Sequence, residues 1–431
     1  MAEKILISLL VPVFNVEKYL PEALNSALGQ TLENIEIICI DDGSSDRSGQ
    51  ILDAYAARDA RIRVKHRANS GYGSAMNLGL DLARGNYIAI LEPDDFLDKH
   101  MLADLYQIAE KYQLDFVKSD FAMIEGEPGA YQISPTHVYW QMEMYGKVLS
   151  RQEKKELFRG YLAHWSCLYR RSFLEKNHIR FNETPGASYQ DTGFWFLTMA
   201  LSERIYLHDG CYYHYRQDNP EASQWSRDKI YCITDEYEFI YKQLSERGML
   251  LDYWPQFVTF SFIGHRDTLY RLSSDHRAEF IRHIASWFGR LEKERRLDTS
   301  FMDVKDKAML EEILCSPESF CDKIVAIPEF IHGMLKLYDD FYIYGAGTRA
   351  KRIYRYLSGE DRKNFLGYLI TEAGEVRRLF GQPVMAVSEV KVGMRTGVII
   401  GVTDRYRREI VEELQRRGIE TAIVLPEENV P

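Results

Sequence analysis

Residues 86–96 read Asn86-Tyr87-Ile88-Ala89-Ile90-Leu91-Glu92-Pro93-Asp94-Asp95-Phe96, a short apolar run followed directly by three carboxylates. The run from Tyr87 to Leu91 predicts a buried strand. In an open α/β sheet, ligands bind outside the carboxyl ends of the strands. Closely spaced carboxylates at such an end suit a divalent cation, which can in turn hold phosphate oxygens. A solvated turn also explains an isolated acidic triplet. The neighbouring sequence has to distinguish this turn from a cation site.

The sequence around this stretch alternates between strand and helix patterns. Apolar runs predict further buried strands at residues 5–13, 35–40 and 61–65. Apolar residues at helical spacing predict helices at 19–28, 51–58 and 74–83. This alternation predicts a doubly wound α/β sheet. The strand at 35–40 ends in Asp41-Asp42, and the strand at 61–65 is followed by the Gly-rich turn 69–73. Acids at two strand ends and glycines at a third predict a nucleotide site.

The composition is that of an ordinary globular protein. The 431 residues are 45% hydrophobic and 27% charged, which is enough chain for two or three domains. A formal net charge of −10 argues against a nucleic-acid partner. Six scattered cysteines without CxxC pairs predict reduced thiols. With no signal peptide and no apolar segment long enough to span a bilayer, we expect a cytoplasmic protein.

Six short motifs of the first hundred residues carry a family resemblance. In order they are Val11-Pro12-Val13-Phe14-Asn15, Gln30-Thr31, Asp41-Asp42-Gly43-Ser44-Ser45-Asp46, Asn69-Ser70-Gly71, Asn77-Leu78-Gly79-Leu80 and Glu92-Pro93-Asp94-Asp95. The ordered set resembles the family 2 glycosyltransferases, which have the GT-A fold. The likeness is close over about the first 100 residues and looser to about residue 225.

That resemblance implies a donor site for a sugar nucleotide. The residues that it places against the donor nucleotide are Pro12, Val13, Asn15, Asp41, Asp42, Asn69, Gly71, Asn77, Glu92, Pro93 and Arg216. Glu92-Pro93-Asp94 stands where the family has its Asp-any-Asp motif. Asp94 would bind Mn²⁺ or Mg²⁺, and Glu92 would face the ribose or a metal-bound water. His214 would be a further metal ligand, although a packed strand histidine explains it as well.

Three positions depart from the family pattern. Glu92 replaces the first Asp of the motif, and its longer side chain changes the ribose contact. Met76 stands where the family commonly has an Arg that holds phosphate, a task that Arg67 or Arg84 could take over. Gln190 replaces the Glu that usually precedes the catalytic Asp.

The acceptor half of the resemblance contains the expected base. Leu168-Tyr169-Arg170-Arg171 resembles a family segment that precedes the catalytic helix, after a loop expected at 125–135. Asp191 matches the family's general base, which takes a proton from the acceptor hydroxyl. A helix N-cap is the alternative explanation of Asp191. Glu183 and Asp218 are the next candidates for the base.

The remaining chain predicts two further parts. We expect the GT-A domain at 1–227, a helical region at 228–335 and a small Rossmann-like α/β domain at 336–431. Gly345-x-Gly347-x-x-Ala350 is a partial dinucleotide fingerprint, with Glu372 as the acid near the expected distance. An interaction module or a degenerate nucleotide or phosphate site also fits this domain.

The sequence therefore predicts an inverting, metal-dependent glycosyltransferase. It would move a sugar from a nucleoside diphosphate donor, a UDP-sugar, to a hydroxyl of a glycan, lipid-linked or cell-envelope polysaccharide acceptor. We expect it in a bacterial cytoplasm, with peripheral association at the inner face of the membrane and homo-oligomerisation left open. Two alternatives are a catalytically weakened binding or assembly protein and, from the glycine fingerprint, a nicotinamide oxidoreductase.

Overall fold

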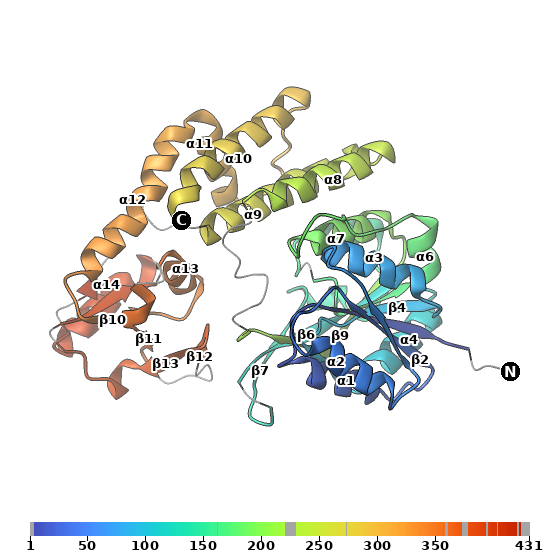
Figure 1. Cartoon of the computed structure of the whole chain (residues 1–431). Helices are drawn as coiled ribbons and strands as arrows, with labels where there is room; N and C mark the ends of the chain where they lie inside the picture. Colours follow the sequence, from blue (N-terminus) through green and yellow to red (C-terminus); the bar gives the residue numbers. More distant parts are fainter. Residues whose placement is uncertain are drawn as a thin grey trace. The chain divides into compact units, whose positions relative to one another are not determined.

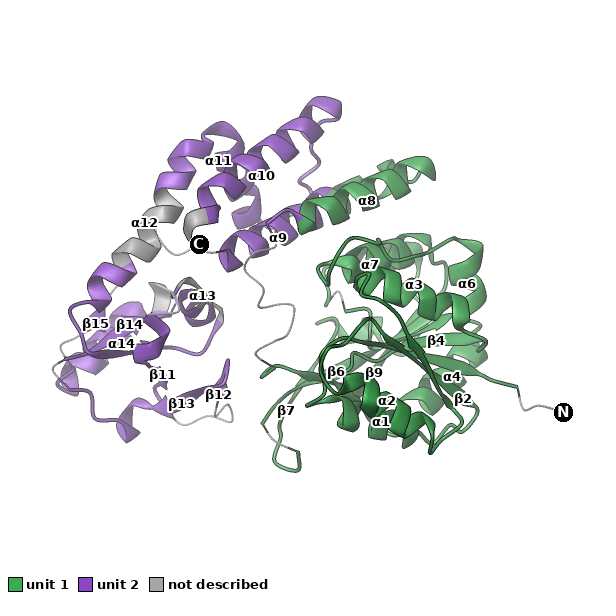
Figure 2. Cartoon of the chain, in the orientation of Figure 1, with its two compact units in different colours: residues 1–224, 232–257 green, residues 225–231, 258–431 purple. Residues whose placement is uncertain are grey.

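The computed structural model divides the chain into two compact units (Figure 2). One comprises residues 1–224 and 232–257, and the other comprises residues 225–231 and 258–431. The structure describes residues 4–126, 128–161, 163–219, 230–272, 274–357, 361–372, 378–393, 395–402, 404–419 and 422–423. The predicted domain boundary at 227/228 lies outside these ranges. The predicted three-domain division stays a prediction.

The first unit is built on one mixed sheet of nine strands. Its strands are β1 (Ile7–Val13), β2 (Ile35–Asp41), β3 (Ile62–His66), β4 (Tyr87–Ile90), β5 (Phe96–Leu97), β6 (Phe116–Glu125), β7 (Gln132–Thr136), β8 (Cys167–Arg170) and β9 (Ile205–Arg216). They are ordered β3-β2-β1-β4-β8-β6-β9-β5, with β7 paired to β6. The first four are parallel, whereas β8 is antiparallel to both of its neighbours. This is the predicted GT-A type of sheet.

Helices cover both faces of this sheet. They are α1 (Leu20–Leu28), α2 (Ser48–Ala56), α3 (Tyr72–Leu82), α4 (Met101–Tyr112), α5 (Arg151–Leu157), α6 (Arg171–Lys176), α7 (Gln190–Leu201) and α8 (Cys232–Glu246). In Figure 1, α1 and α2 lie on one side of the strands and α3, α6 and α7 on the other. Every residue of β1, β2 and β4 is buried between these layers, as expected for a parallel sheet with two covered faces.

A strand occupies part of the segment that was expected to be a loop. A loop was expected at 125–135, but β6 runs to Glu125 and β7 begins at Gln132. The prediction of a continuous loop was wrong because its second half pairs with β6 as an edge strand. Pro135 is tolerated there since β7 pairs on one side only, with β6.

The second unit contains helices and a smaller sheet. Its elements are α10 (Ser274–Glu294), α11 (Val304–Cys315), α12 (Pro317–Leu335), β10 (Asp340–Tyr344), α13 (Thr348–Tyr356), β11 (Phe365–Ile370), β12 (Arg378–Leu379), β13 (Gln382–Ala386), β14 (Thr396–Ile400), α14 (Asp404–Arg416) and β15 (Ala422–Ile423). Helix α9 (Trp254–Arg271) begins in the first unit and ends in the second. The strand order is β12-β13-β11-β10-β14-β15, parallel except for β12. Its description as Rossmann-like stays a prediction.

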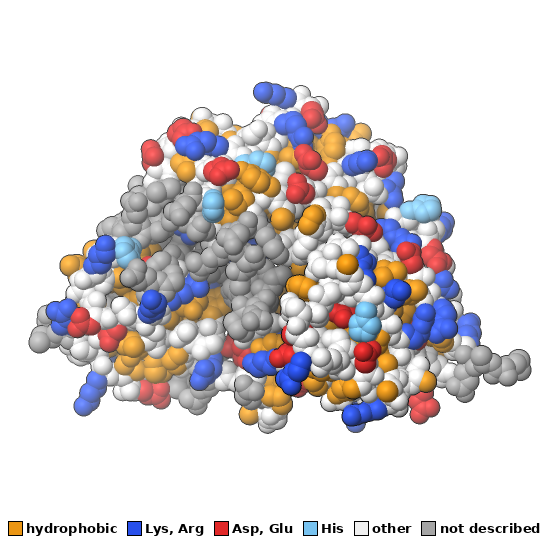
Figure 3. Space-filling model, viewed as in Figure 1, with side chains coloured by type: hydrophobic (Ala, Val, Ile, Leu, Met, Phe, Trp, Pro, Cys, Tyr) orange, Lys and Arg blue, Asp and Glu red, His pale blue; other side chains and the backbone are white. Residues whose placement is uncertain are grey.

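The surface seen in Figure 3 intersperses acidic and basic side chains without a large area of one sign. Among the described residues, no helix is both long and apolar enough to cross a membrane. Neither finding tests the expected location of the protein.

Candidate active site

The residues that follow β4, Glu92-Pro93-Asp94-Asp95, form a braced turn that we call the acidic loop. The Tyr213 hydroxyl accepts a hydrogen bond from the Glu92 N–H at 3.0 Å and donates to Asp95 Oδ2 at 2.9 Å. The Arg216 backbone N–H donates to Asp95 Oδ1 at 2.7 Å. Burial, followed by the charge of Asp94, raises the pKa of Asp95 well above its usual range. Asp95 therefore has a structural role: its hydrogen bonds fix the conformation of the loop that carries Glu92 and Asp94.

The environment of Asp94 disfavours its charged form, which a nearby cation would stabilise. Burial raises its pKa, the hydrogen bond from Asn219 Nδ2 at 2.8 Å opposes this, and the charge of Glu92 raises it further. Among the residues that the structure describes, no group of three His, Cys, Asp or Glu side chains could hold a metal ion alone. Mg²⁺ and similar ions are commonly bound by one or two carboxylates together with substrate phosphates. The residues present fit such a shared site.

The predicted nucleoside-binding residues lie at the carboxyl ends of β1 and β2. Val13, which follows Pro12 in β1, accepts the Asp42 N–H at its carbonyl oxygen at 2.9 Å. Asn15 has a positive φ of 49° and accepts the Ser45 N–H at 2.7 Å. These contacts place the predicted residues at one edge of the sheet, as parallel strands require.

Two carboxylates at this edge already have protein partners. Asp41 contacts His66 Nδ1 at 2.7 Å and accepts the Ser44 N–H at 3.0 Å. Burial opposes these hydrogen bonds, but they prevail and lower the pKa of Asp41. Asp42 accepts the N–H groups of Ser70 and Gly71, the latter at 2.8 Å, and so holds the glycine turn. Asp42 also pairs with Arg67 Nε at 3.1 Å, whereas Asp41 keeps a lone pair for a ligand.

Two other predicted donor residues connect this edge to the loop before α7. Asn77 in α3 donates to the Phe181 carbonyl at 3.0 Å and to Glu183 Oε1 at 2.8 Å, and it accepts the Phe181 N–H. Gly71 packs against residues 184–186, where an added Cβ would come within 2.8 Å of the Thr184 carbonyl oxygen. Asn69 is exposed beside this turn.

Asp191 is the second residue of α7, and the helix begins at Gln190, so Asp191 is not its N-cap. Its side chain remains 44% exposed, and its Oδ2 lies 3.9 Å from His164 Nδ1. The pKa of Asp191 is raised, chiefly because the surrounding protein removes water from the carboxyl group. His164 opposes this shift, and the charge of Glu92 adds to it. A carboxylate that is both accessible and raised in pKa suits a general base. The other candidates are occupied, since Glu183 pairs with Asn77 and Asp218 accepts the Gly126 N–H.

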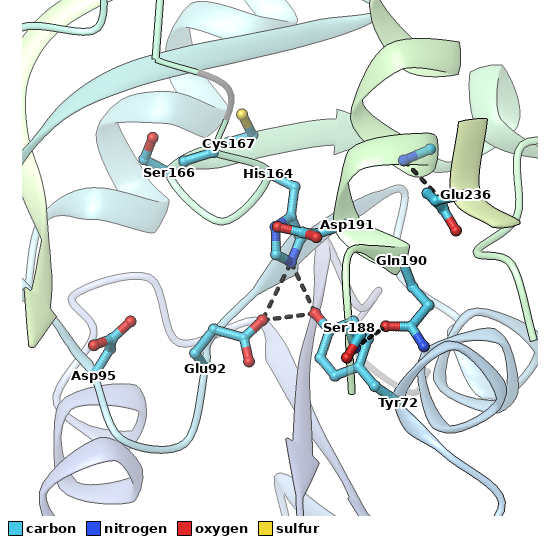
Figure 4. Close-up of polar contacts among 12 residues, drawn as sticks. Tyr72, Glu92, Asp95, His164, Ser166, Cys167, Ser188, Gln190, Asp191 and Glu236 are labelled. Atoms are coloured by element: carbon cyan, nitrogen blue, oxygen red, sulfur yellow. Dashed lines mark hydrogen bonds and ion pairs between the residues drawn. The ribbon is translucent and has the colours of Figure 1, made fainter. Parts of the chain in front are cut away.

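The donor-side and acceptor-side carboxylates meet at a histidine that the sequence did not single out (Figure 4). His164 Nε2 lies 2.8 Å from the Tyr72 hydroxyl and 3.2 Å from Glu92 Oε1, and Tyr72 donates to the same oxygen at 2.6 Å. The Asp191 side chain lies beside the ring. His164 comes from the irregular segment before β8, so no strand or helix periodicity marks it. Its place just before the family-like segment at 168–171 was the available signal.

The structure places the last two predicted residues differently. Arg216 is buried, donates to the Asp94 carbonyl oxygen at 2.8 Å and pairs with Glu22 at 2.6 Å. Its guanidinium therefore braces the acidic loop. His214 follows Tyr213 directly in β9, so its ring points to the opposite face of the sheet from the Tyr213 ring. It stacks on Phe96 at 4.4 Å. Its role as a metal ligand stays a prediction that this position does not support.

Comparison with known proteins identifies relatives of the first unit. The family described as Glycosyl transferase family 2 matches residues 8–177. The uncharacterized glycosyltransferase EpsJ of Bacillus subtilis is 38% identical over 220 residues, which are 50% of this chain and 62% of EpsJ. Glycosyltransferase GlyG of Streptococcus pneumoniae is 30% identical over 236 residues, covering 52% of this chain and 77% of GlyG. A crystal structure of residues 1–349 of S. aureus TarS with UDP-GlcNAc aligns at a TM-score of 0.44 and 19% identity, over 64% of this chain and 86% of that fragment.

Proposed function

Because the chain belongs to glycosyltransferase family 2 and is a glycosyltransferase, we propose that it is inverting and metal-dependent. It transfers a sugar from a nucleoside diphosphate donor, a UDP-sugar, to a hydroxyl of a glycan or cell-envelope polysaccharide. The observation that carries the proposal is the meeting of Glu92 and Asp191 at one His164 ring. It brings the loop expected to bind the donor next to the carboxylate expected to activate the acceptor.

In the proposed reaction, Asp191 accepts the proton of the acceptor hydroxyl as that oxygen attacks the anomeric carbon. The bond from the acceptor oxygen to the anomeric carbon forms while the bond to the diphosphate oxygen breaks, and the electron pair leaves with the diphosphate. One displacement from the face opposite the leaving group inverts the configuration. The raised pKa of Asp191 makes it a stronger base than an ordinary Asp.

Asp94 would hold Mn²⁺ or Mg²⁺ together with the donor phosphates. Such an ion would neutralise charge on the departing diphosphate. Asp41 and Asp42 would line the nucleoside pocket, and Asp41 would accept from the uracil N–H with the lone pair that its protein partners leave. We assign Glu92 to orienting Tyr72 and His164 beside the sugar, since its Oε1 already accepts from both.

The departures from the family pattern are compatible with this function. Gln190 is buried, donates to the Thr184 hydroxyl at 2.9 Å and accepts the Ser188 N–H at 2.5 Å. It thus fixes the loop that precedes the base. Met76 is buried in α3 and packs in the core. Neither substitution removes the carboxylate that the reaction needs.

A donor panel tests this proposal. The full chain is incubated with UDP-, GDP- and TDP-sugars and Mn²⁺, and release of the nucleoside diphosphate is measured. We expect turnover with a UDP-sugar, loss of turnover in Asp191→Asn, and unchanged donor affinity in that variant. Tight nucleotide binding without turnover of any donor would instead indicate a binding or assembly protein. Retention of most activity by Asp191→Asn would place the base elsewhere.

A further inference from the structure

His164 occupies a position that the protein builds from several sides. Only 3% of the residue is exposed. The Tyr169 hydroxyl donates to its carbonyl oxygen at 2.6 Å. The preceding residue, Ala163, accepts a hydrogen bond from the buried ammonium of Lys118, which also donates to the Ser166 hydroxyl at 3.0 Å. Burying a lysine to hold one loop is costly unless its hydrogen bonds are made. The segment that carries the histidine is therefore fixed.

The contacts of the ring decide which nitrogen carries the proton in the neutral form. Tyr72 has one hydroxyl proton and directs it to Glu92 Oε1 at 2.6 Å. The tyrosine oxygen and the same carboxylate oxygen then both face His164 Nε2, at 2.8 and 3.2 Å. Two acceptors around one ring nitrogen require an N–H there. The neutral ring is thus protonated at Nε2, and Nδ1 carries a lone pair.

This assignment leaves Nδ1 facing Asp191. Nδ1 is buried and has no hydrogen-bond partner among the described residues, and the nearest charged atom is Asp191 Oδ2 at 3.9 Å. A lone pair beside a carboxylate is unfavourable until one proton lies between them. Catalytic hydrogen bonds are often this long before substrate binds and shorten in the complex.

We propose that His164 is a positioning residue that shares, through Nδ1, the proton that Asp191 takes from the acceptor hydroxyl. This inference rests on the proposed function. The proton leaves the acceptor oxygen, binds Asp191 Oδ2 and is shared with His164 Nδ1. Meanwhile the acceptor oxygen bonds to the anomeric carbon, and the bond from that carbon to the diphosphate oxygen breaks, its electron pair leaving with the diphosphate. The imidazolium that forms is flanked by the Glu92 carboxylate. After the sugar has been transferred, the proton returns through Asp191 to water.

The groups that face His164 come from three elements and one loop. Tyr72 lies in α3, Glu92 in the acidic loop, Asp191 in α7, and Tyr169 in β8 next to the His164 backbone. The Phe181 ring packs edge-on at 6.0 Å and carries no charge. Asp191 is the only one of the four titratable groups that faces Nδ1.

Nitrogen NMR on the full chain tests the inference without any substrate. The protein is labelled with ¹⁵N-histidine, and His164→Gln identifies the resonances of His164. We expect an unprotonated Nδ1 and a protonated Nε2 at high pH. In Asp191→Asn at the same high pH, the Nδ1 resonance of His164 should move, because the anionic group beside its lone pair is replaced by a neutral amide. A ring protonated at Nδ1 at high pH, or an Nδ1 resonance that Asp191→Asn leaves unchanged, would overturn the proposal.

Kinetics with UDP-GlcNAc and the other donors of the panel give a second readout. We expect His164→Gln to lower kcat roughly tenfold to a hundredfold, to change the KM for the donor less than about threefold, and to shift the acid limb of the pH profile. His137→Gln is the matched control, since His137 contacts Asp120 at 2.6 Å elsewhere in the same unit. Equal kcat values and pH profiles for the His164 variant and wild type would refute the proposal. If no donor reacts, the proposed function fails while the NMR result still decides the role of Nδ1.

Discussion

A buried carboxyl group beside the base makes the stability of this protein depend on pH. Glu236 in α8 is 1% exposed, and it accepts the Gly193 N–H at 2.9 Å and the Asn182 amide at 3.0 Å. Burial raises its pKa from 4.5 to about 8, the Asn182 hydrogen bond opposes this, and Asp191 adds to it. The folded protein therefore holds a proton that the unfolded chain releases, so stability is fully present below pH 4.5 and is lost as pH rises through about 8.

Glu236→Gln should abolish this loss. Because a tenfold change in a protonation equilibrium corresponds to about 1.4 kcal/mol, the wild type should lose up to about 4 kcal/mol relative to the variant between about pH 5 and about pH 8.5. The Asn182 amide can turn to offer its oxygen to the new amide, so the hydrogen bonds survive. Guanidinium unfolding of both proteins, followed by tryptophan fluorescence at several pH values, measures the difference. Glu238→Gln, an exposed position on the same helix, is the control. Parallel stability curves for wild type and Glu236→Gln would refute the reasoning.

Three further predictions concern the same unit. Asp94→Asn should weaken Mn²⁺-dependent UDP binding at least about tenfold by calorimetry, while Asp191→Asn should bind UDP like wild type; equal affinities in both variants would contradict this. Gly193→Ala should cost about 1–3 kcal/mol in unfolding experiments, because its Cβ would lie 2.0 Å from Glu236 Oε1, and adding Glu236→Ala should recover part of the loss. Tyr213→Phe should cost about 1–3 kcal/mol, since it removes the hydroxyl that donates to Asp95 Oδ2 and accepts the Glu92 N–H; an unchanged unfolding midpoint would contradict this role of the hydroxyl.

The parallel half of the sheet could be predicted because its strands are short, continuous and apolar. Strands that are buried on both faces read as apolar runs, and the acids that follow β2 and β4 then fall at one edge. Residues 132–136 could not be predicted as a strand, because an exposed edge strand with a proline lacks that signal. Local pattern identifies elements that are buried on both sides better than those at an edge.

The roles of individual site residues were harder to infer. Arg216 was expected to contact the donor nucleotide, yet it pairs with Glu22 from α1, a contact 194 positions away in sequence. His164 was missed for the same reason, since its partners Tyr72 and Glu92 lie 92 and 72 positions away. A motif predicts which residue types gather at a strand end. It does not predict which of these side chains pair with one another by hydrogen bonds or ion pairs, because that pairing depends on contacts between distant segments.

The glycine turn after β3 shows how such a contact can account for a motif. The sequence suggested that glycines at 71 and 73 form part of a nucleotide site. In the structure, a Cβ at Gly73 would lie 1.9 Å from the Asn182 carbonyl oxygen, and the Tyr72 N–H donates to the Gly186 carbonyl at 2.9 Å. The two glycines thus let α3 approach the loop that leads to Asp191. Since Tyr72 lies between them and also contacts Glu92 and His164, the close approach sets the distance between donor-side and acceptor-side carboxylates. A larger residue at 73 would separate the two halves of the site before it affected any phosphate.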